Sequence, residues 1–367
     1  MAKTKIAVLT GGGDAPGLNA VIYALTRSCK RNMDCELIGY KFGYRGLYHN
    51  DFMPLTMEST TGILHKGGTI LYSSNKDNLF NYALEENGQI VKKDVSDIAV
   101  ENMKKEGVDV LVVLGGDGTL TSARDFARKG VNVVGIPKTI DNDLVCTEQT
   151  FGFDSAVNIV AENLGRLHTT TESHHRVMVV EVMGRSAGWL ALQSGIAGSA
   201  DVILIPEIPY SLDKVVEKIY ERDARGKYFT IIVVTEGAIE KGGAAVVGKM
   251  VADSPDPVRF GGIAAKIAMD LEKLVVHEIR SCALGHIQRG GDTSAFDRVL
   301  SVRYGVAAAD LIRAKKFGNM VCFREGRMDY VSLEDVISGV CAGKSKNVDP
   351  HGELVRVAKD LGITFGD

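Results

Sequence analysis

The sequence predicts an α/β protein built as two doubly wound, three-layer α/β/α domains with mainly parallel sheets. Its length of 367 residues exceeds that of one typical domain. Short β-branched runs alternate with longer amphipathic stretches, a spacing that is typical of βαβ units. The short runs are almost continuously apolar rather than alternating, which indicates strands that helices cover on both faces.

The expected elements follow one another in regular order. The strands are the short runs rich in Val, Ile and Leu, and the helices are the longer stretches with apolar residues on one face. Strands are expected at 6–10, 37–40, 108–114, 131–136, 177–182, 202–205, 230–235 and 321–323. Helices are expected at about 19–32, 97–106, 120–129, 155–171, 187–195, 212–225, 260–274, 296–314 and 331–338.

The chain is expected to divide near residue 150, where a second strand–helix series begins. One domain is expected to comprise residues 1–152, with about 288–338 returning to it. The other is expected to comprise residues 153–287 with about 339–367. The polar, irregular stretches 76–97 and 241–258 are interpreted as surface insertions.

Composition excludes several classes of protein. Apolar residues make up 45% and charged residues 24% of the chain, enough for a sizeable core and too apolar for a disordered protein. The net charge is −3, so no basic excess suggests a nucleic-acid or membrane partner. No apolar run reaches 18 residues and no secretory signal is visible, so we expect a cytoplasmic protein. The six cysteines form no CxxC pair, which favours scattered, reduced thiols over a disulfide framework or a zinc site.

A glycine-rich loop follows the first expected strand. Gly11, Gly12 and Gly13 stand between that strand and a helix, in the sequence TGGGDAPGLNA. Glycines let backbone N–H groups approach an anion closely, and the helix N-terminus adds partial positive charge. The pattern matches neither GxGxxG nor GxxxxGK[ST], so it supports neither a dinucleotide fold nor a P-loop. The alternative is a tight turn without a ligand.

A second loop, GGDGT, follows the most apolar expected strand. It places Asp117 between Gly116 and Gly118 at the start of a helix. An aspartate in such a loop can hold Mg²⁺ while the surrounding amides hold phosphate. The alternative is an aspartate that caps its helix.

A third loop, PKTIDND, ends the next expected strand. Asp141 and Asp143 stand two residues apart, with Lys138 beside them. One carboxylate can take the proton from an attacking hydroxyl, the other can lie near a metal ion, and the lysine can neutralise developing phosphoryl charge. The alternative is a solvated acidic turn. Three such loops at successive strand ends favour phosphoryl transfer over that alternative.

Several cationic residues lie at the ends of later strands in a chain that has no basic excess. Arginine binds phosphate through a two-pronged fork, so their position indicates a phosphorylated small substrate. For any one arginine, the alternative is a surface ion pair. Glu236 ends an apolar strand and could accept a sugar hydroxyl or cap the segment that follows. The cationic residues are His175, Arg176, Arg185, Arg280, His286 and Arg289.

Six segments resemble motifs of the 6-phosphofructokinase family, in the family's order. They are TGGGDAPGLNA, GGDGT, PKTIDND, VEVMGR, VVTEG and LGHIQRGG, and they run from residue 10 to residue 291. The resemblance implies transfer of a phosphoryl group to the 1-hydroxyl of fructose 6-phosphate, with Mg²⁺ as cofactor. It implies that the domain of residues 1–152 binds the donor and Mg²⁺ and that the other binds the sugar phosphate. It also implies a homodimer or homotetramer.

The resemblance further implies roles for individual residues. Asp141 corresponds to the general base and Asp117 to the carboxylate associated with Mg²⁺. The other implied catalytic residues are Lys138, Thr139, Asp143 and Arg185. The implied donor-binding positions are Gly13, Tyr44, Asn75, Lys76, Gly116, Asp117, Gly118 and Thr119. The implied substrate-binding positions are Thr139, Asp141, Arg176, Met183, Gly184, Arg185, Glu236, Arg280, His286 and Arg289.

Two of these arginines are implied to act between subunits. Arg176 and Arg280 match family positions that reach the sugar phosphate bound by a neighbouring subunit. An isolated monomer would then have an incomplete phosphate site.

Two positions point to different donors. In the family, GGDD with PKTIDND is typical of pyrophosphate enzymes, and GGDG with PGTIDND is typical of bacterial ATP enzymes. This chain combines Gly118 with Lys138. An aspartate at 118 would put a negative charge where the α-phosphate of ATP must pass, so we predict ATP. The alternatives are a reversible pyrophosphate enzyme, which could also accept sedoheptulose 7-phosphate, and a non-catalytic sugar-phosphate-binding subunit.

The chain departs from the family pattern at Asn75. Family members usually have an arginine there, which bridges the phosphates of donor and substrate. We hypothesise that Lys138, together with Lys76, supplies the missing charge. The effector site of bacterial ATP enzymes uses several arginines, of which this chain retains only one. We therefore expect little response to ADP or phosphoenolpyruvate at that site. The corresponding positions are Tyr23, Arg27, Met57 and His168.

Overall fold

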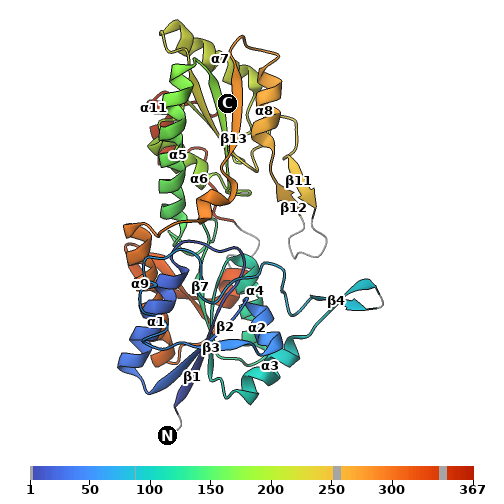
Figure 1. Cartoon of the computed structure of the whole chain (residues 1–367), viewed down its shortest axis with the longest axis vertical. Helices are drawn as coiled ribbons and strands as arrows, with labels where there is room; N and C mark the ends of the chain where they lie inside the picture. Colours follow the sequence, from blue (N-terminus) through green and yellow to red (C-terminus); the bar gives the residue numbers. More distant parts are fainter. Residues whose placement is uncertain (1–2, 87, 251–257, 339–344) are drawn as a thin grey trace.

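Two separate β-sheets organise the molecule. The structure is a computed structural model that describes residues 3–86, 88–250, 258–338 and 345–367. Figure 1 shows two lobes stacked along the long axis, with the N-terminus at the free end of one lobe and the C-terminus in the other. We call the lobe that contains the N-terminus the first lobe and the other the second lobe.

The first lobe contains a seven-stranded, mainly parallel sheet. Its inner strands pair in parallel, and the antiparallel pairs lie at its two edges. The strand order is β15 (Arg327–Ser332), β14 (Asn319–Arg324), β7 (Val133–Pro137), β6 (Val110–Gly115), β1 (Thr4–Thr10), β2 (Cys35–Tyr40) and β3 (Phe52–Pro54).

The second lobe contains a four-stranded sheet in which every pairing is parallel. The strand order is β13 (Ile279–Ala283), β8 (Val177–Val182), β10 (Thr230–Thr235) and β9 (Val202–Leu204). The prediction of a mixed α/β fold with mainly parallel sheets is therefore confirmed.

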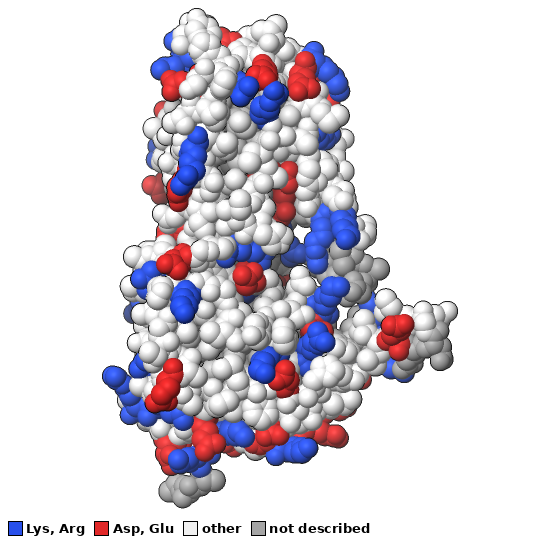
Figure 2. Space-filling model, in the orientation of Figure 1, with Lys and Arg blue, Asp and Glu red and all other residues white. Residues whose placement is uncertain are grey.

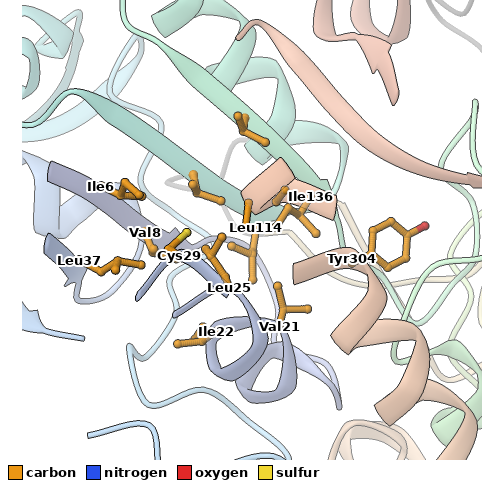
Figure 3. Close-up of a cluster of buried hydrophobic side chains, with 14 of the residues drawn as sticks. Ile6, Val8, Val21, Ile22, Leu25, Cys29, Leu37, Leu114, Ile136 and Tyr304 are labelled. Atoms are coloured by element: carbon orange, nitrogen blue, oxygen red, sulfur yellow. The ribbon is translucent and has the colours of Figure 1, made fainter. Parts of the chain in front are cut away.

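Both faces of each sheet are covered by helices. In β1, Ile6 and Val8 pack with α1 (Leu18–Asn32) and α9 (Ala295–Arg313), in the cluster drawn in Figure 3. The alternate residues Ala7 and Leu9 belong to the cluster on the opposite face. Since successive side chains of a strand point to opposite faces, a sheet between two helical layers needs strands that are apolar at every position. The opposite face is covered by α2 (Tyr44–His49), α3 (Ser96–Lys105), α4 (Asp117–Arg128) and α10 (Leu333–Ile337).

The second lobe repeats this arrangement around β8. Met178 and Val180 pack in one cluster, and Val177 and Val179 pack in another. The first cluster includes α5 (Phe153–Ser173), α6 (Trp189–Ala197) and α11 (Glu353–Asp360), and the second includes α7 (Leu212–Ala224) and α8 (Ile263–Leu271).

The expected strands and helices all occur, with ends shifted by a few residues. No strand or helix was expected from the sequence at β3, β13, β15, α2 or α11. The stretch 76–97 forms a hairpin, β4 (Tyr82–Glu86) with β5 (Gln89–Lys93), rather than irregular chain. The stretch 241–258 lies partly outside the described residues, and β11 (Val247–Met250) pairs with β12 (Val258–Phe260).

Two further expectations concern the chain as a whole. Within the described ranges, no helix has the length and apolar character needed to cross a membrane. Cys29, Cys35, Cys282 and Cys322 are free thiols. The expectation of reduced cysteines is wrong for Cys146, which is disulfide-bonded.

Candidate active site

The three loops singled out in the sequence meet at the carboxyl ends of β1, β6 and β7. The N–H of Gly11 donates to the carbonyl of Leu114 at 2.9 Å, and the N–H of Lys138 donates to the carbonyl of Gly115 at 2.9 Å. The ammonium of Lys138 donates to the carbonyl of Gly13. Adjacent parallel strands therefore bring the glycine loop, GGDGT and PKTIDND together at one edge of the sheet, a region that we call the crevice.

Packing explains two of the glycines. A Cβ on Gly11 would lie 2.6 Å from Cγ2 of Thr119, and a Cβ on Gly115 would overlap the same side chain. The side chain of Thr119 thus lies between Gly11 and Gly115, and only glycine at both positions leaves room for it. At these two positions the glycine pattern serves the contact between loops as well as any approach of an anion.

Gly118 differs because it borders open space. Apart from its two chain neighbours and the backbone of its own helix, no atom of the described residues lies within 4 Å of the position that its Cβ would occupy. Asp117 beside it is exposed at the start of α4, yet partial burial of its carboxyl raises its pKa, and the charge of Arg185 opposes that rise. This end of the crevice combines free volume, a helix N-terminus and one carboxylate.

The remaining predicted donor positions lie around the glycine loop. Tyr44 is buried, and its hydroxyl donates to the carbonyl of Thr119 at 2.8 Å, so it supports the GGDGT loop from beneath. The N–H of Gly12 donates to the carbonyl of Ser74 at 2.9 Å. This contact brings the segment containing the exposed residues Asn75 and Lys76 beside the glycine loop.

Asp141 presents an acceptor that lacks a partner. Its side chain is only 6% exposed, and no hydrogen-bond donor among the described residues reaches its Oδ1 atom. The other oxygen, Oδ2, accepts from the hydroxyl of Thr139 at 3.4 Å. A buried carboxylate oxygen without a partner is costly, and such atoms are few in folded proteins. A substrate hydroxyl would provide the missing donor.

The ionisable groups around Asp141 are strongly perturbed. Burial, aided by the charge of Asp141, raises the pKa of Asp143 to about 6. Burial and the charge of Arg289 lower the pKa of Lys138 to about 8. Burial and the charge of Asp141 also raise the pKa of Glu236 to about 7. Such shifts in a cleft are typical of a functional site.

The second lobe contributes a loop that follows β8. Gly184 has a φ of 136° and Arg185 has a φ of 52°, which is a strained conformation for a residue with a side chain. The N–H of Arg185 donates to Oε1 of Glu236 at 3.1 Å, and the N–H of Met183 donates to Oε1 of Gln288 at 3.2 Å. These bonds hold the loop in a shape that the backbone alone would not adopt.

Arg289 connects the two lobes across the crevice. Its Nη1 donates to the carbonyl of Asp14 at 3.2 Å, and its Nε lies 3.5 Å from the sulfur of Met183. A Cβ on Gly13 would overlap the guanidinium, so glycine at 13 gives this arginine its place. His286 is exposed in the short 3₁₀ helix Gly285–Arg289. Figure 2 shows Lys and Arg side chains gathered at the level where the lobes meet.

Comparisons with known proteins identify a family for the chain. A family model described as Phosphofructokinase matches residues 5–312 of the chain. The chain belongs to the phosphofructokinase family. A relative from Clostridium perfringens, named ATP-dependent 6-phosphofructokinase 2, is 66% identical over 99% of this chain and 98% of its own length. The pyrophosphate–fructose 6-phosphate 1-phosphotransferase of Amycolatopsis methanolica is 46% identical over 90% of this chain and 94% of its own length.

The fold also resembles that of a solved structure. Phosphofructokinase from Saccharomyces cerevisiae has a TM-score of 0.77 and 29% identity over 91% of this chain. This chain spans 45% of that yeast chain.

In this phosphofructokinase, Arg176 and Arg280 lie away from the crevice of their own chain. Arg176 precedes β8, whereas Met183 follows it, and a six-residue strand spans about 20 Å. Glu278 holds both arginines: its Oε2 accepts from Nε of Arg176 at 2.6 Å, and its Oε1 accepts from Arg280. The structure therefore does not bring this pair to the other predicted site residues of the same chain.

Sequence reasoning missed several residues that shape the site. Gln288 lies within the LGHIQRGG motif and is fully buried, but its role in holding Met183 has no local signal. Glu278 was also missed, as were Asn142 and Lys346. Asn142 stands inside PKTIDND, whereas Lys346 belongs to no motif.

Proposed function

We propose that this phosphofructokinase transfers the γ-phosphoryl group of ATP to the 1-hydroxyl of fructose 6-phosphate. The observation that carries the proposal is the partnerless, buried Oδ1 atom of Asp141. In the proposed reaction, Asp141 takes the hydroxyl proton as the sugar oxygen bonds to the γ-phosphorus. The bond between that phosphorus and the β–γ bridging oxygen breaks, and ADP leaves. General base catalysis of this kind is worth about 10²–10⁴-fold in rate.

The open space at Gly118 supports a nucleotide as donor. A side chain there would enter the free volume beside Asp117 and the start of α4. The ATP-dependent name of the 66% identical relative points the same way. Lys138 matches the PKTIDND pattern of the second candidate, a reversible pyrophosphate enzyme. It does not exclude ATP, because its buried ammonium would serve a phosphoryl group from either donor.

The residues present fit a Mg²⁺ ion that accompanies the donor. Mg²⁺ is usually bound by one or two carboxylates together with substrate phosphates rather than by a cage of side chains. Within the described ranges, no cluster of three His, Cys, Asp or Glu residues could hold a metal alone. Asp117 is the carboxylate that would hold the ion. When bound, Mg²⁺ would neutralise charge on the donor phosphates.

The arginines held by Glu278 support a shared site between subunits. We propose a homodimer or homotetramer in which Arg176 and Arg280 bind the sugar phosphate of a neighbouring subunit. We also propose that residues 1–152 with 288–338 bind the donor, and that residues 153–287 with 339–367 bind fructose 6-phosphate.

The first test is a coupled assay with fructose 6-phosphate and Mg²⁺, run in parallel with ATP and with pyrophosphate. Turnover with ATP alone is expected, and Asp141→Asn should lose at least 100-fold in kcat. Turnover with pyrophosphate alone would show that Lys138 outweighs Gly118. Absence of turnover with both donors would favour the non-catalytic interpretation.

A second experiment tests the shared site. Asp141→Asn and Arg280→Ala proteins should each be nearly inactive alone. In a hybrid dimer, the chain with Arg280→Ala keeps its own Asp141 and receives Arg280 from its neighbour, so one complete site forms. Co-expression is expected to restore turnover. No gain over the separate variants would contradict sharing.

A further inference from the structure

We infer that Lys346, near the C-terminus, is a positioning residue for catalysis: it holds the turn 141–143 through the side chain of Asn142. The inference rests on the proposed function and adds a residue to it. Lys346 lies outside residues 5–312, which match the family model, and outside all six motifs.

Asn142 stands between the two catalytic carboxylates in a conformation that needs support. Its φ is 51°, and its side chain is 4% exposed. Asparagine tolerates the left-handed region better than most residues, but the conformation still persists only where the surroundings impose it. The direction of this residue sets where Asp141 and Asp143 point, because they are its two neighbours in the chain.

The support comes from two donors. Oδ1 of Asn142 accepts from Nζ of Lys346 at 3.1 Å and from the N–H of Thr150 at 3.2 Å. The Lys346 ammonium also donates to the carbonyl of Glu148. The ammonium of Lys346 thus connects the side chain of Asn142, inside the turn, to the backbone at Glu148. Hydrogen bonds from a charged donor are stronger than neutral ones.

Lys346 is itself anchored to both lobes. Its N–H donates to the carbonyl of Asp143 at 2.9 Å, and its carbonyl accepts from Nε1 of Trp189 at 2.7 Å. Its ammonium lies 5.6 Å from the centroid of the Trp189 ring. Two residues further on, the N–H of Val348 donates to Oε1 of Glu207 at 2.8 Å. The C-terminal segment therefore holds the catalytic turn against the second lobe.

A role in packing alone would not require a lysine. Burial lowers the pKa of Lys346 to about 8, against the opposing charges of Glu148 and Asp143, so the charged form is costly here. A methionine would fill a similar volume without that cost. What the ammonium adds is a pair of directed hydrogen bonds to Asn142 and Glu148, and these act on the turn that holds the base.

The test compares three variants of the full-length protein. Lys346→Met removes the donors and keeps most of the volume, and its backbone bond to Asp143 is retained. Lys346→Arg keeps the charge and the donors. Lys359→Met is the matched control. Lys359 lies on α11, pairs with Asp367, and has its ammonium 5.8 Å from the Phe365 ring centroid, so its contacts are to the C-terminal residues rather than to the catalytic turn.

The measurements are kcat and KM for both substrates, the melting temperature, and the fluorescence of Trp189, which is the only tryptophan. Lys346→Met is expected to lose at least 10-fold in kcat with KM for fructose 6-phosphate within threefold, because displaced catalytic groups cost rate more than binding. Lys346→Arg should recover kcat to within threefold of the parent. Trp189 emission should change in Lys346→Met and stay the same in Lys359→Met.

Two outcomes would overturn the inference. One is a kcat of Lys346→Met within twofold of the parent. The other is a fall in kcat that follows a lowered melting temperature and that arginine does not reverse, since that pattern would indicate a purely structural role. If Lys346→Met does not fold, Lys346→Gln takes its place, with an expected loss of at least fivefold in kcat. Turnover of the parent tests the proposed function, and the ratio of variant to parent tests this inference.

Discussion

Replacing Lys138 with methionine is expected to stabilise the fold at neutral pH. The lysine is 4% exposed, and burial lowers its pKa from 10.5 to about 8. Since the folded pKa lies below the unfolded value, the charged lysine opposes folding. The penalty is fully present below pH 8 and is relieved as pH rises from 8 to 10.5. The lowered pKa corresponds to a folding penalty of roughly 3 kcal/mol at pH 7 and of less than about 1 kcal/mol at pH 10.

The quantity to measure is the difference between the penalty at pH 7 and the penalty at pH 10. Methionine also removes the hydrogen bond from Lys138 to the carbonyl of Gly13, which for the neutral amine offsets about 0.5–1.5 kcal/mol of the gain. That loss is the same at both pH values. The unfolding free energy of the variant, relative to that of the parent, should therefore be roughly 2 kcal/mol greater at pH 7 than at pH 10. Urea unfolding of both proteins at the two pH values measures it, with Lys359→Met as the control. An equal difference in unfolding free energy at pH 7 and pH 10 would refute the reasoning.

The same substitution tests the catalytic role of Lys138. If its ammonium replaces the family arginine that is missing at Asn75, Lys138→Met should lose at least 10-fold in kcat with ATP. A variant that is more stable at neutral pH and also slower would show that the lysine is retained for function. An unchanged kcat would leave only the cost of burial and would contradict the hypothesis.

Three further predictions concern the donor, the substrate and regulation. Gly118→Asp should fold normally, because its Cβ enters open space, and should raise KM for ATP at least 10-fold by repelling the phosphates; an unchanged KM would show that the donor passes elsewhere. Glu236, whose pKa is raised to about 7, becomes a full acceptor as pH rises, so KM for fructose 6-phosphate should fall between pH 6 and 8, and Glu236→Gln should remove that dependence. ADP and phosphoenolpyruvate should leave the fructose 6-phosphate saturation curve in place. Arg27 stacks 4.3 Å from the Tyr23 ring centroid, and a shifted sigmoidal curve would show that this face still binds effectors.

Strands that are buried on both faces could be predicted from the sequence, whereas edge strands with exposed residues could not. β6 and β8 are apolar at nearly every position, and β1 and β10 are apolar except at their ends, because helices cover both sides of these strands. β13 lies at the edge of its sheet and exposes most of its residues, so its sequence carries no continuous apolar run. The antiparallel edge strand β15 has the same property.

Site residues that directly follow a strand could be predicted from the sequence. Asp117 and Asp141 were found because the ends of adjacent parallel strands meet at one edge of the sheet. Lys346 could not be found in this way, since it acts on Asn142 across 204 positions of sequence. Its contact depends on the path of the chain between lobes, for which no local pattern exists.

The crevice holds ionisable groups of both signs whose pKa values lie within about one unit of pH 7. The pKa values of Asp143 and Glu236 are raised to about 6 and 7, and that of Lys138 is lowered to about 8. Desolvation is the largest cause in all three cases, so the protein alone does not fully compensate the charges that it buries. Phosphates brought by substrates would stabilise the charged form of Lys138, and a bound cation would do the same for the carboxylates. Binding is therefore expected to move these groups back toward full ionisation, which couples substrate affinity to proton uptake and release.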